Sequence, residues 1–520
     1  MVMLKIPAFD ETDYICEYEN DNTIVVLIPN AADRFCQYVE LLMEEGFAQK
    51  EDYQTENHHF AAFEKEGTGI FLNSFNKTNE LQILTEENTS YFNYTDMPGQ
   101  DAVTSQLTQI KLTDFGLSYV IRLSDGRFLV IDGGNRVDEE ADALYECLTE
   151  QSFTEIPVIA AWIMTHPHSD HFYCFFPFME RHGKDVIIEK FFYNFPEAYD
   201  FEHYPNLAKE STRFEGCIGA QVVQMFLDAV AEMGVPVYTP HTGQRYVVGN
   251  AKIRFLGTMD DTIHCSENIN ATSLIFTTEI AGQTILWGAD GSFGDARLAE
   301  RYANELKSDI LQIPHHGFGC GPEDALIQCY RLIAPRVCLL TASHMEAFTS
   351  FTTYRESTNY LMTCQGIKEM ITGKRQRTLT LPYEPAPNGV IELRQQYLEG
   401  RDNCGARAWI FTDLDTGNKD DFVFSVLNTS YINANLSIEL YFEGMQKKII
   451  RVQTIGPRLG VFRVNCVLNA DEDPSVVDLP DFLDTKGIPE NAPFAVRFIS
   501  NIPVVISHRC HQPAYHSTVV

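Results

Sequence analysis

The chain has 520 residues and a formal net charge of −33, from 39 basic against 72 acidic side chains. A chain of this length exceeds what one hydrophobic core serves, so we expect roughly three domains. Hydrophobic residues make up 44% and charged residues 21%, as in ordinary globular proteins, which excludes a disordered or fibrous chain. The acidic charge disfavours binding to nucleic acids and anionic membranes, because both are negatively charged.

The cysteines and the first residues bear on the cellular compartment. The 13 cysteines are an odd number and form no C-x-x-C pair, so free thiols in a reducing compartment are expected. Residues 1–13 carry acidic side chains and no long apolar run, unlike a secretory signal peptide. The apolar stretch at 158–164 is too short to cross a bilayer. These features predict a cytoplasmic protein that is not in a membrane.

Residues 1–95 predict a small α/β domain of unknown role. A β-rich run at 23–28 precedes a helical pattern at 31–45, in which apolar residues recur at spacings of three and four. Three more strand-like runs follow, at 60–63, 69–75 and 81–84. The adjacent His58 and His59 are interpreted as a solvated pair, since neighbours in an extended segment point to opposite faces.

Residues 104–395 predict a layered α/β domain, because strand and helix patterns alternate along them. The domain opens with a hairpin, in which extended segments at 118–123 and 128–131 flank an Asp-Gly turn. The second segment runs into Asp132-Gly133-Gly134, where glycine lets the backbone turn sharply. Residues 94–105 are polar, contain a Pro-Gly pair and are interpreted as a linker.

Residues 400–520 differ from the rest of the chain. Helical periodicity largely disappears, and short strand-like runs remain, separated by Asn, Asp, Gly and Pro. This pattern predicts a β-sandwich module. The expected fold class of the whole chain is therefore α+β, with three domains in sequence.

The strongest chemical signal follows the apolar run at 158–164. His166, His168, Asp170 and His171 fall within six residues, directly after a predicted strand. Imidazole and carboxylate ligands suit zinc, iron or manganese. A short loop can turn His166 and His168 toward one ion, and Asp170 and His171 toward a second.

Further candidate ligands stand at the ends of later apolar runs. Asp290 lies in a Gly-Ala-Asp-Gly segment, where a carboxylate could bridge two ions, although Asp-Gly is also a common turn. His315 and His316 follow another apolar run. Asp132 also ends a predicted strand, and we expect it to orient a ligand histidine through a hydrogen bond.

Together these motifs resemble the metallo-β-lactamase superfamily over residues 104–395. An H-x-H-x-D-H segment at 166–171 follows Ile-Asp-Gly-Gly and precedes Gly-Ala-Asp and Pro-His-His-Gly. With Asn270-Ala271-Thr272-Ser273-Leu274, the pattern is most similar to the branch typified by the hydrolase domain of bacterial competence proteins and by phosphorylcholine esterase. The resemblance implies an αββα sandwich with two metal ions at the edge of its sheets.

Carried over by position, the resemblance implies a full set of site residues. The metal ligands would be His166, His168, Asp170, His171, Asp290 and His316. The first two would bind one ion and the next two the other, with Asp290 as the bridge. Asp170 would also orient the attacking water or relay its proton, and His315 would contact the substrate or leaving group. Which of His315 and His316 is the ligand stays open at this stage.

The chain departs from the family pattern at three places. Phe172-Tyr173-Cys174 stands where Gly-Gly usually follows the Asp-His pair, and Phe318 stands where Ser follows His-His-Gly. Many members also give the first ion another histidine from the interval before the bridging Asp. The candidates in that interval, none within a convincing motif, are His182, His203, His241 and His264.

Residues 408–510 carry a second resemblance, to the small β-sandwich of sensory-rhodopsin-transducer-like proteins. The runs that carry it include Ala408-Trp409-Ile410-Phe411, Ile438-Glu439-Leu440-Tyr441-Phe442 and Asn491-Ala492-Pro493-Phe494. Members of that family assemble as oligomers. The resemblance therefore implies an assembly or ligand-sensing role, with a homo-oligomer as one outcome.

The leading hypothesis is a hydrolase that uses two divalent metal ions, zinc first with manganese or iron as alternatives, to activate water. A small phosphoester or phosphodiester is the favoured substrate, since the charge of −33 disfavours long nucleic acids. A lactone, ester or β-lactam would suit the same site. A di-iron redox or sensor protein is less favoured, because the sequence contains no Gly-rich nucleotide loop, and a non-catalytic scaffold is the third alternative.

Overall fold

The computed structural model divides the chain into two compact units. The first comprises Met1–His344 with Tyr360–Pro385, and the second comprises Met345–Asn359 with Ala386–Val520. The residues whose structure is described are 14–87, 94–96, 99, 101–204, 206–207, 219–266, 268–342, 356–363, 367–373, 375–385, 406–415, 423–428, 434–444, 449–455, 461–465, 489, 491–508 and 515–517. Over these ranges, no helix is both long enough and apolar enough to cross a membrane.

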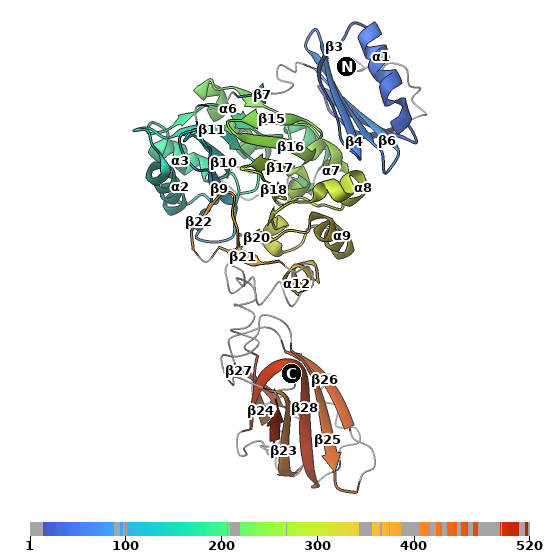
Figure 1. Cartoon of the computed structure of the whole chain (residues 1–520), viewed down its shortest axis with the longest axis vertical. Helices are drawn as coiled ribbons and strands as arrows, with labels where there is room; N and C mark the ends of the chain where they lie inside the picture. Colours follow the sequence, from blue (N-terminus) through green and yellow to red (C-terminus); the bar gives the residue numbers. More distant parts are fainter. Residues whose placement is uncertain are drawn as a thin grey trace. The chain divides into compact units, whose positions relative to one another are not determined.

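The N-terminal part of the first unit is a six-stranded antiparallel sheet that carries one helix (Figure 1). Its elements are β1 (Ile15–Glu19), β2 (Thr23–Pro29), α1 (Phe35–Glu44), β3 (Ala48–Gln54), β4 (His58–Lys65), β5 (Thr68–Phe75) and β6 (Glu80–Glu86). The strand order is β1-β2-β6-β5-β4-β3, so the two strands that the sequence pattern missed are the two edges. Edge strands are largely exposed, and the polar sequence of β3 lacks the alternation by which the central strands were predicted.

Alternate residues of this sheet face two different hydrophobic cores. Val26 and Phe63 pack with Phe35 of α1 in one core. Their neighbours Val25 and Ala62 face the opposite way and join a core that continues into the following domain. The N-terminal sheet is therefore packed against that domain as well as against its own helix.

His58 does not belong to a solvated pair, contrary to the expectation from the sequence. It is fully buried in β4, where its Nδ1 accepts a hydrogen bond from Arg254 at 2.9 Å and its Nε2 lies 2.8 Å from Asn73 Oδ1. His59 points to the other face and pairs with Asp52. Because side chains alternate along a strand, the sequence predicted that the two rings point in opposite directions. It did not predict that His58 points into the interface with the following domain.

Polar contacts also join the N-terminal sheet to the rest of the first unit. Three side chains donate hydrogen bonds across the interface: Tyr18 to Asp200 at 2.7 Å, Tyr53 to the Gly243 carbonyl at 2.6 Å, and Gln82 to Asp261 at 2.5 Å. Asp261 in turn pairs with the buried Arg301 at 3.0 Å. Each of these buried polar groups thus has a partner, which buried polar groups require.

The centre of the first unit is an αββα sandwich of two eight-stranded sheets (Figure 1), as predicted from the sequence. The first sheet contains β8 (Gln106–Gln109), β9 (Ser118–Arg122), β10 (Phe128–Asp132), β11 (Val158–Ile163), β12 (Ile187–Ile188), β13 (Phe191–Phe192), β14 (Val237–Tyr238) and β22 (Arg377–Thr380). The second contains β7 (Tyr94–Thr95), β15 (Arg245–Val248), β16 (Ala251–Gly257), β17 (Ile275–Ile280), β18 (Gln283–Trp287), β19 (Ile310–Gln312), β20 (Val337–Leu340) and β21 (Glu369–Thr372). Ile131, Ile163 and Trp287 are among the side chains packed between the sheets.

Helices cover the outer faces of both sheets. Helices α2 (Asp138–Gln151), α3 (Phe175–His182) and α6 (Ala220–Met233) lie over the first sheet, and α7 (Met259–Ser266), α8 (Leu298–Tyr302) and α9 (Glu323–Ile333) lie on the side of the second (Figure 1). Two short helices, α4 (Ala198–His203) and α12 (Glu356–Thr363), complete the described set. The α+β fold class predicted from the sequence is confirmed.

Parallel pairing brings the functional segments of each sheet to one edge. In the first sheet, β10 and β11 are parallel, and in the second, β18, β19 and β20 are parallel. Carboxyl ends of parallel strands meet at the same edge, so the residues that follow these five strands are neighbours in space. The candidates that stand at such strand ends are His166, His168, Asp170, His171, Asp290, His315 and His316.

Apart from residues 356–359, which begin α12, the elements of the second unit within its described residues are strands. They are β23 (Ala406–Asp415), β24 (Val423–Leu427), β25 (Ala434–Phe442), β26 (Ile449–Ile455), β27 (Val461–Asn465), β28 (Pro493–His508) and β29 (Tyr515–Ser517). The long strand β28 pairs with β23 and β25 along its first part and with β24 along its last part. Phe411, Phe424 and Phe498 pack together in the core of this unit. The assembly or ligand-sensing role of this module stays a prediction.

Candidate metal centre

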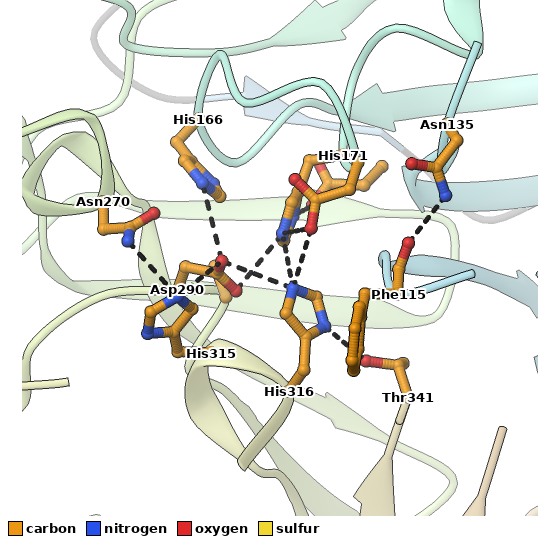
Figure 2. A network of polar contacts seen from close by, with 12 residues as sticks. Phe115, Asn135, His166, His171, Asn270, Asp290, His315, His316 and Thr341 are labelled. Atoms are coloured by element: carbon orange, nitrogen blue, oxygen red, sulfur yellow. Dashed lines mark hydrogen bonds and ion pairs between the residues drawn. The ribbon is translucent and has the colours of Figure 1, made fainter. Parts of the chain in front are cut away.

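The candidate site is built from loops at the carboxyl ends of strands in both sheets (Figure 2). The loop after β11 carries the H-x-H-x-D-H segment, and the turns after β18 and β19 carry Asp290 and the pair His315 and His316. A backbone bond from the amide of Leu274 to the Thr165 carbonyl, at 3.0 Å, ties the first loop to the second sheet. The site therefore lies where the two sheets meet.

Two groups of potential ligand atoms lie at this edge. One consists of Asp170, His171, Asp290 and His316, and the other of His166, His168 and Asp290. Within each group, one ligand atom from every residue lies within 4.8 Å of the others. The structure thus brings together all six residues for which the sequence implies metal binding. Asp290 belongs to both groups, which is the position required of a bridging carboxylate.

The four-residue group is tightly packed. His171 Nε2 lies 3.2 Å from Asp290 Oδ1 and 3.3 Å from His316 Nε2. His316 Nε2 lies 3.1 Å from Asp170 Oδ2. Two ring nitrogens that face each other at this distance need a shared proton or a cation between them and the carboxylates. Nitrogen and oxygen donors converging in this way match the ligand chemistry of zinc and related ions.

Hydrogen bonds on the far side of each ring orient the histidines. Asp132 accepts from the Thr165 amide at 2.7 Å and lies 2.8 Å from His171 Nδ1. Because a carboxylate only accepts, Nδ1 of His171 carries the hydrogen and its Nε2 faces the group. His316 Nδ1 lies 2.7 Å from Thr341 Oγ1, so this ring also turns Nε2 toward the group.

The three-residue group contains a buried nitrogen without a hydrogen bond. His166 is fully buried, and its Nε2, 3.9 Å from Asp290 Oδ2, has no hydrogen-bond partner. A buried polar atom that stays unsatisfied destabilises the fold by about 1–3 kcal/mol. A cation coordinated by His166, His168 and Asp290 would satisfy this nitrogen, so the residues present fit a metal ion.

The electrostatics of the site depend on carboxylates and imidazoles in close contact. Burial lowers the pKa of His166, and the neighbouring His171 lowers it further. Burial also acts to lower the pKa of His316, but Asp290 and Asp170 outweigh it and raise the pKa to about 9. The pKa of Asp290 is held below its ordinary range, because His171 and His316 outweigh its burial. Protons thus offset the carboxylates here, and a bound cation would replace them.

The backbone at the site is strained. Asp132, Ala289, His315 and His316 have φ values of 52°, 45°, 50° and 50°. Side chains other than glycine rarely adopt these left-handed conformations, which cost about 1–3 kcal/mol each and cluster at functional sites.

His315 and His316 occupy different environments. His316 is buried and belongs to the four-residue group. The side chain of His315 is 29% exposed and lies outside both groups, with Nε2 3.9 Å from Asp290 Oδ2. Its Nδ1 donates to the Gly319 carbonyl at 2.9 Å, and Asn270 Nδ2 lies 3.4 Å from its Nε2 (Figure 2).

The four histidines considered for the first ion lie elsewhere. None of them belongs to either ligand group within the described part of the chain. Their contacts lie outside the candidate site: His182 stacks on Tyr145, His203 stacks on Tyr199, His241 pairs with Asp260, and His264 contacts Cys265. Sequence reasoning also missed Thr341 and Phe115, which contact His316. Thr341 directly follows β20, so the alignment of strand ends was the signal that could have found it.

The αββα sandwich, with histidine and aspartate clustered at its strand ends, is an α+β domain with a candidate metal site. Residues 113–243 match the family model of the metallo-beta-lactamase superfamily, so a domain of this superfamily is present. Proteins of the superfamily are usually hydrolytic.

Other comparisons add little to this finding. A solved structure of the Anabaena sensory rhodopsin transducer is similar at 21% identity over 20% of this chain and 95% of that one, with a TM-score of 0.16. No curated protein matches the chain.

Proposed function

We propose that the protein is a hydrolase that holds two divalent cations, zinc first and manganese or iron as alternatives, and acts on a small phosphoester or phosphodiester. The observation that carries the proposal is the pair of ligand groups joined by Asp290. His166 and His168 would hold the first ion, and Asp170, His171 and His316 the second. When bound, such ions lower the pKa of a water molecule and stabilise negative charge on the reacting group.

Two side chains of the protein would orient the attacking water and contact the substrate. Asp170 is 25% exposed, unlike the fully buried His171 beside it, so its second oxygen can accept a hydrogen bond from the attacking water. His315 donates a hydrogen bond from Nδ1 to the Gly319 carbonyl, and its Nε2 lies 3.9 Å from Asp290 Oδ2. From there it would contact the substrate or the leaving group.

The polarity of the site favours a substrate with a single phosphoester. Among the described residues, no lysine or arginine contacts any of the six ligand residues or His315. A polyphosphate or a long nucleic acid would need such cations along its path. The resemblance to the competence-protein and phosphorylcholine-esterase branch, made on sequence motifs, supports the same substrate class.

A lactone, carboxyl ester or β-lactam is the second candidate substrate class, since the same ligand groups would serve acyl chemistry. Protein purified without added metal and then loaded with zinc or manganese should be screened on bis-p-nitrophenyl phosphate, phosphorylcholine, a lactone and a β-lactam. Phosphodiester hydrolysis above the rate on the acyl substrates supports the proposal. Stoichiometric iron without any hydrolysis would favour the redox or sensor alternative instead.

Asp290→Ala is the decisive variant, because it removes the ligand that both groups share. We expect it to lose both ions and at least about 100-fold in activity, and His168→Ala to lose mainly the first ion. His182→Ala, which changes a histidine outside both groups, is the matched control and should keep metal content and rate. Activity that survives Asp290→Ala and His168→Ala would show that the proposed centre is not the catalyst.

A further inference from the structure

Within the described part of the chain, three side chains of the site are partly exposed: His168, Asp170 and His315. The side chains of His171, Asp290 and His316 are at most 2% exposed, whereas Asp170 is 25% and His315 is 29% exposed. A substrate therefore reaches the centre at the opening that these partly exposed side chains form. Whatever lines this opening contacts the part of the substrate next to the reacting bond.

Two phenylalanines stand at this opening. Phe115 and Phe318 are both partly exposed and pack edge to face, with ring centroids 4.9 Å apart. The Phe318 ring lies 5.9 Å from the His315 ring, and the Phe115 ring lies 6.3 Å from the His316 ring. Figure 2 shows Phe115 beside His316, across the centre from Asn270 and His315. The pair thus lies beside His315 and His316.

The position of Phe115 is fixed by its surroundings. The Phe115 carbonyl accepts a hydrogen bond from the side chain of Asn135 (Nδ2) at 2.6 Å. The backbone N–H of Asn135 in turn donates to Glu140 at 2.6 Å. The next residue, Gly116, has φ 152°, and a Cβ there would lie 2.5 Å from the Asp170 carbonyl. Only glycine allows this segment to lie directly against the H-x-H-x-D-H loop. These contacts hold the backbone from which the Phe115 ring projects, so the position of the residue at the site is preformed.

We propose that Phe115 and Phe318 form a specificity-determining wall that binds an aromatic group of the substrate, so that aryl phosphoesters are preferred over alkyl phosphoesters. The inference rests on the proposed function and names its substrate class more narrowly. Edge-to-face phenylalanines offer a planar aromatic group both stacking and edge contacts. No basic side chain is among the described contacts of the site, so a second anionic group on the substrate would have no counter-charge there. An uncharged aromatic group therefore suits the wall better than an anionic one.

The test compares two substrates that share a leaving group. Bis-p-nitrophenyl phosphate and methyl p-nitrophenyl phosphate differ only in whether the retained group is aromatic. We expect the ratio of their kcat/KM values to fall about five- to tenfold in Phe318→Leu and in Phe115→Leu, the size of a lost aromatic contact. Phe153→Leu, which changes an exposed phenylalanine that does not contact the site, is the matched control and should keep the wild-type ratio.

Binding of two phosphonates to the zinc-loaded full chain provides a second readout that does not depend on turnover. Isothermal titration should show phenylphosphonate binding more tightly than methylphosphonate to the wild type, with the preference lost in Phe318→Leu. A wild type that hydrolyses neither ester but shows this preference would overturn the proposed substrate chemistry and support the wall. Hydrolysis with an unchanged ratio in both leucine variants, or equal or no binding of the two phosphonates, would overturn the wall.

Discussion

At the scale of single residues, the ligand histidines are oriented by hydrogen-bond partners that are not themselves candidate metal ligands. The motif residues His166, His168, Asp170 and His171 could be found from sequence, because their spacing is itself unusual. The contacts that orient His171 and His316 could be predicted only in part. Nothing in the sequence around Thr341 marks it, and only the alignment of the strands shows that it lies beside His316. The burial of His58 was missed for a related reason, because a single strand does not reveal what packs on each of its faces.

Asp132→Asn should weaken metal binding without unfolding the protein. An asparagine keeps the shape but offers one acceptor oxygen where Asp132 now receives Thr165 and His171, so the tautomer of His171 is no longer fixed. We expect a 10- to 100-fold loss of affinity for the second ion, by analogy with other partners of this kind. Competition with a fluorescent chelator measures it. Asp142→Asn, at a surface carboxylate, serves as control, and equal affinities in all three proteins would contradict the role of Asp132.

The buried His241 should make stability depend on pH. Burial acts to lower its pKa, but Asp260 and Glu86 outweigh burial and raise the pKa to about 10. Since the folded pKa exceeds the unfolded one, the stabilisation is complete below about pH 6.5 and is lost as pH rises through about 10. The difference in free energy of unfolding between wild type and His241→Asn should therefore shrink by a few kcal/mol over this range. Urea denaturation at pH 6, 8 and 10 measures it, with His182→Asn as control, and a constant difference would refute the assignment.

At the scale of elements, the order of strands determines which loops meet. The sequence predicted the central strands, because their apolar residues recur regularly, and missed the polar edge strands β1 and β3. Neither edge contributes to the metal centre, so these errors did not affect the prediction of the site. The loop before β9 did matter, and its role could not be predicted, because only the fold brings Gly116 against Asp170.

Gly116→Ala should damage the centre more than the fold. Alanine would place its Cβ 2.5 Å from the Asp170 carbonyl and force the H-x-H-x-D-H loop to shift. We expect at least about a tenfold loss in activity, because small displacements of catalytic groups have large effects on rate. Gly282→Ala is a matched control: it too has a positive φ, but no atom lies within 4 Å of the added carbon. It should cost about 1–2 kcal/mol of stability and leave the rate unchanged. Equal losses of activity in the two variants would contradict this reasoning.

At the scale of the whole molecule, the N-terminal sheet and the αββα sandwich form one compact unit, whereas the β-sandwich module lies in the other. The shared core of Val25, Ala62 and Ile263 and the buried pair of Arg301 with Asp261 join the sheet to the sandwich. The sequence pattern separates the N-terminal sheet from the sandwich at the predicted linker. Hydrophobic periodicity indicates single helices and strands, but it does not indicate which domains share a core.

Truncation at the two domain boundaries, after residue 385 and before residue 96, should have different effects on folding. A fragment of residues 1–385 keeps the described contacts of the metal centre, and we expect it to bind both ions and to retain its rate within about twofold. A fragment of residues 96–385 exposes the apolar face that the N-terminal sheet covers and should be insoluble or lose its cooperative transition. Circular dichroism and metal analysis compare the two. A folded, active 96–385 fragment would show that the N-terminal sheet is dispensable.

The sharing of Asp290 by both ligand groups limits how this centre can change over time. A substitution at His166 or His168 removes ligands of one ion and leaves the other group complete. A substitution at Asp290 damages both groups at once. Loss of one ion alone is therefore open through any ligand that belongs to a single group, but not through Asp290, so Asp290 should be the last ligand to vary among proteins that descend from this chain.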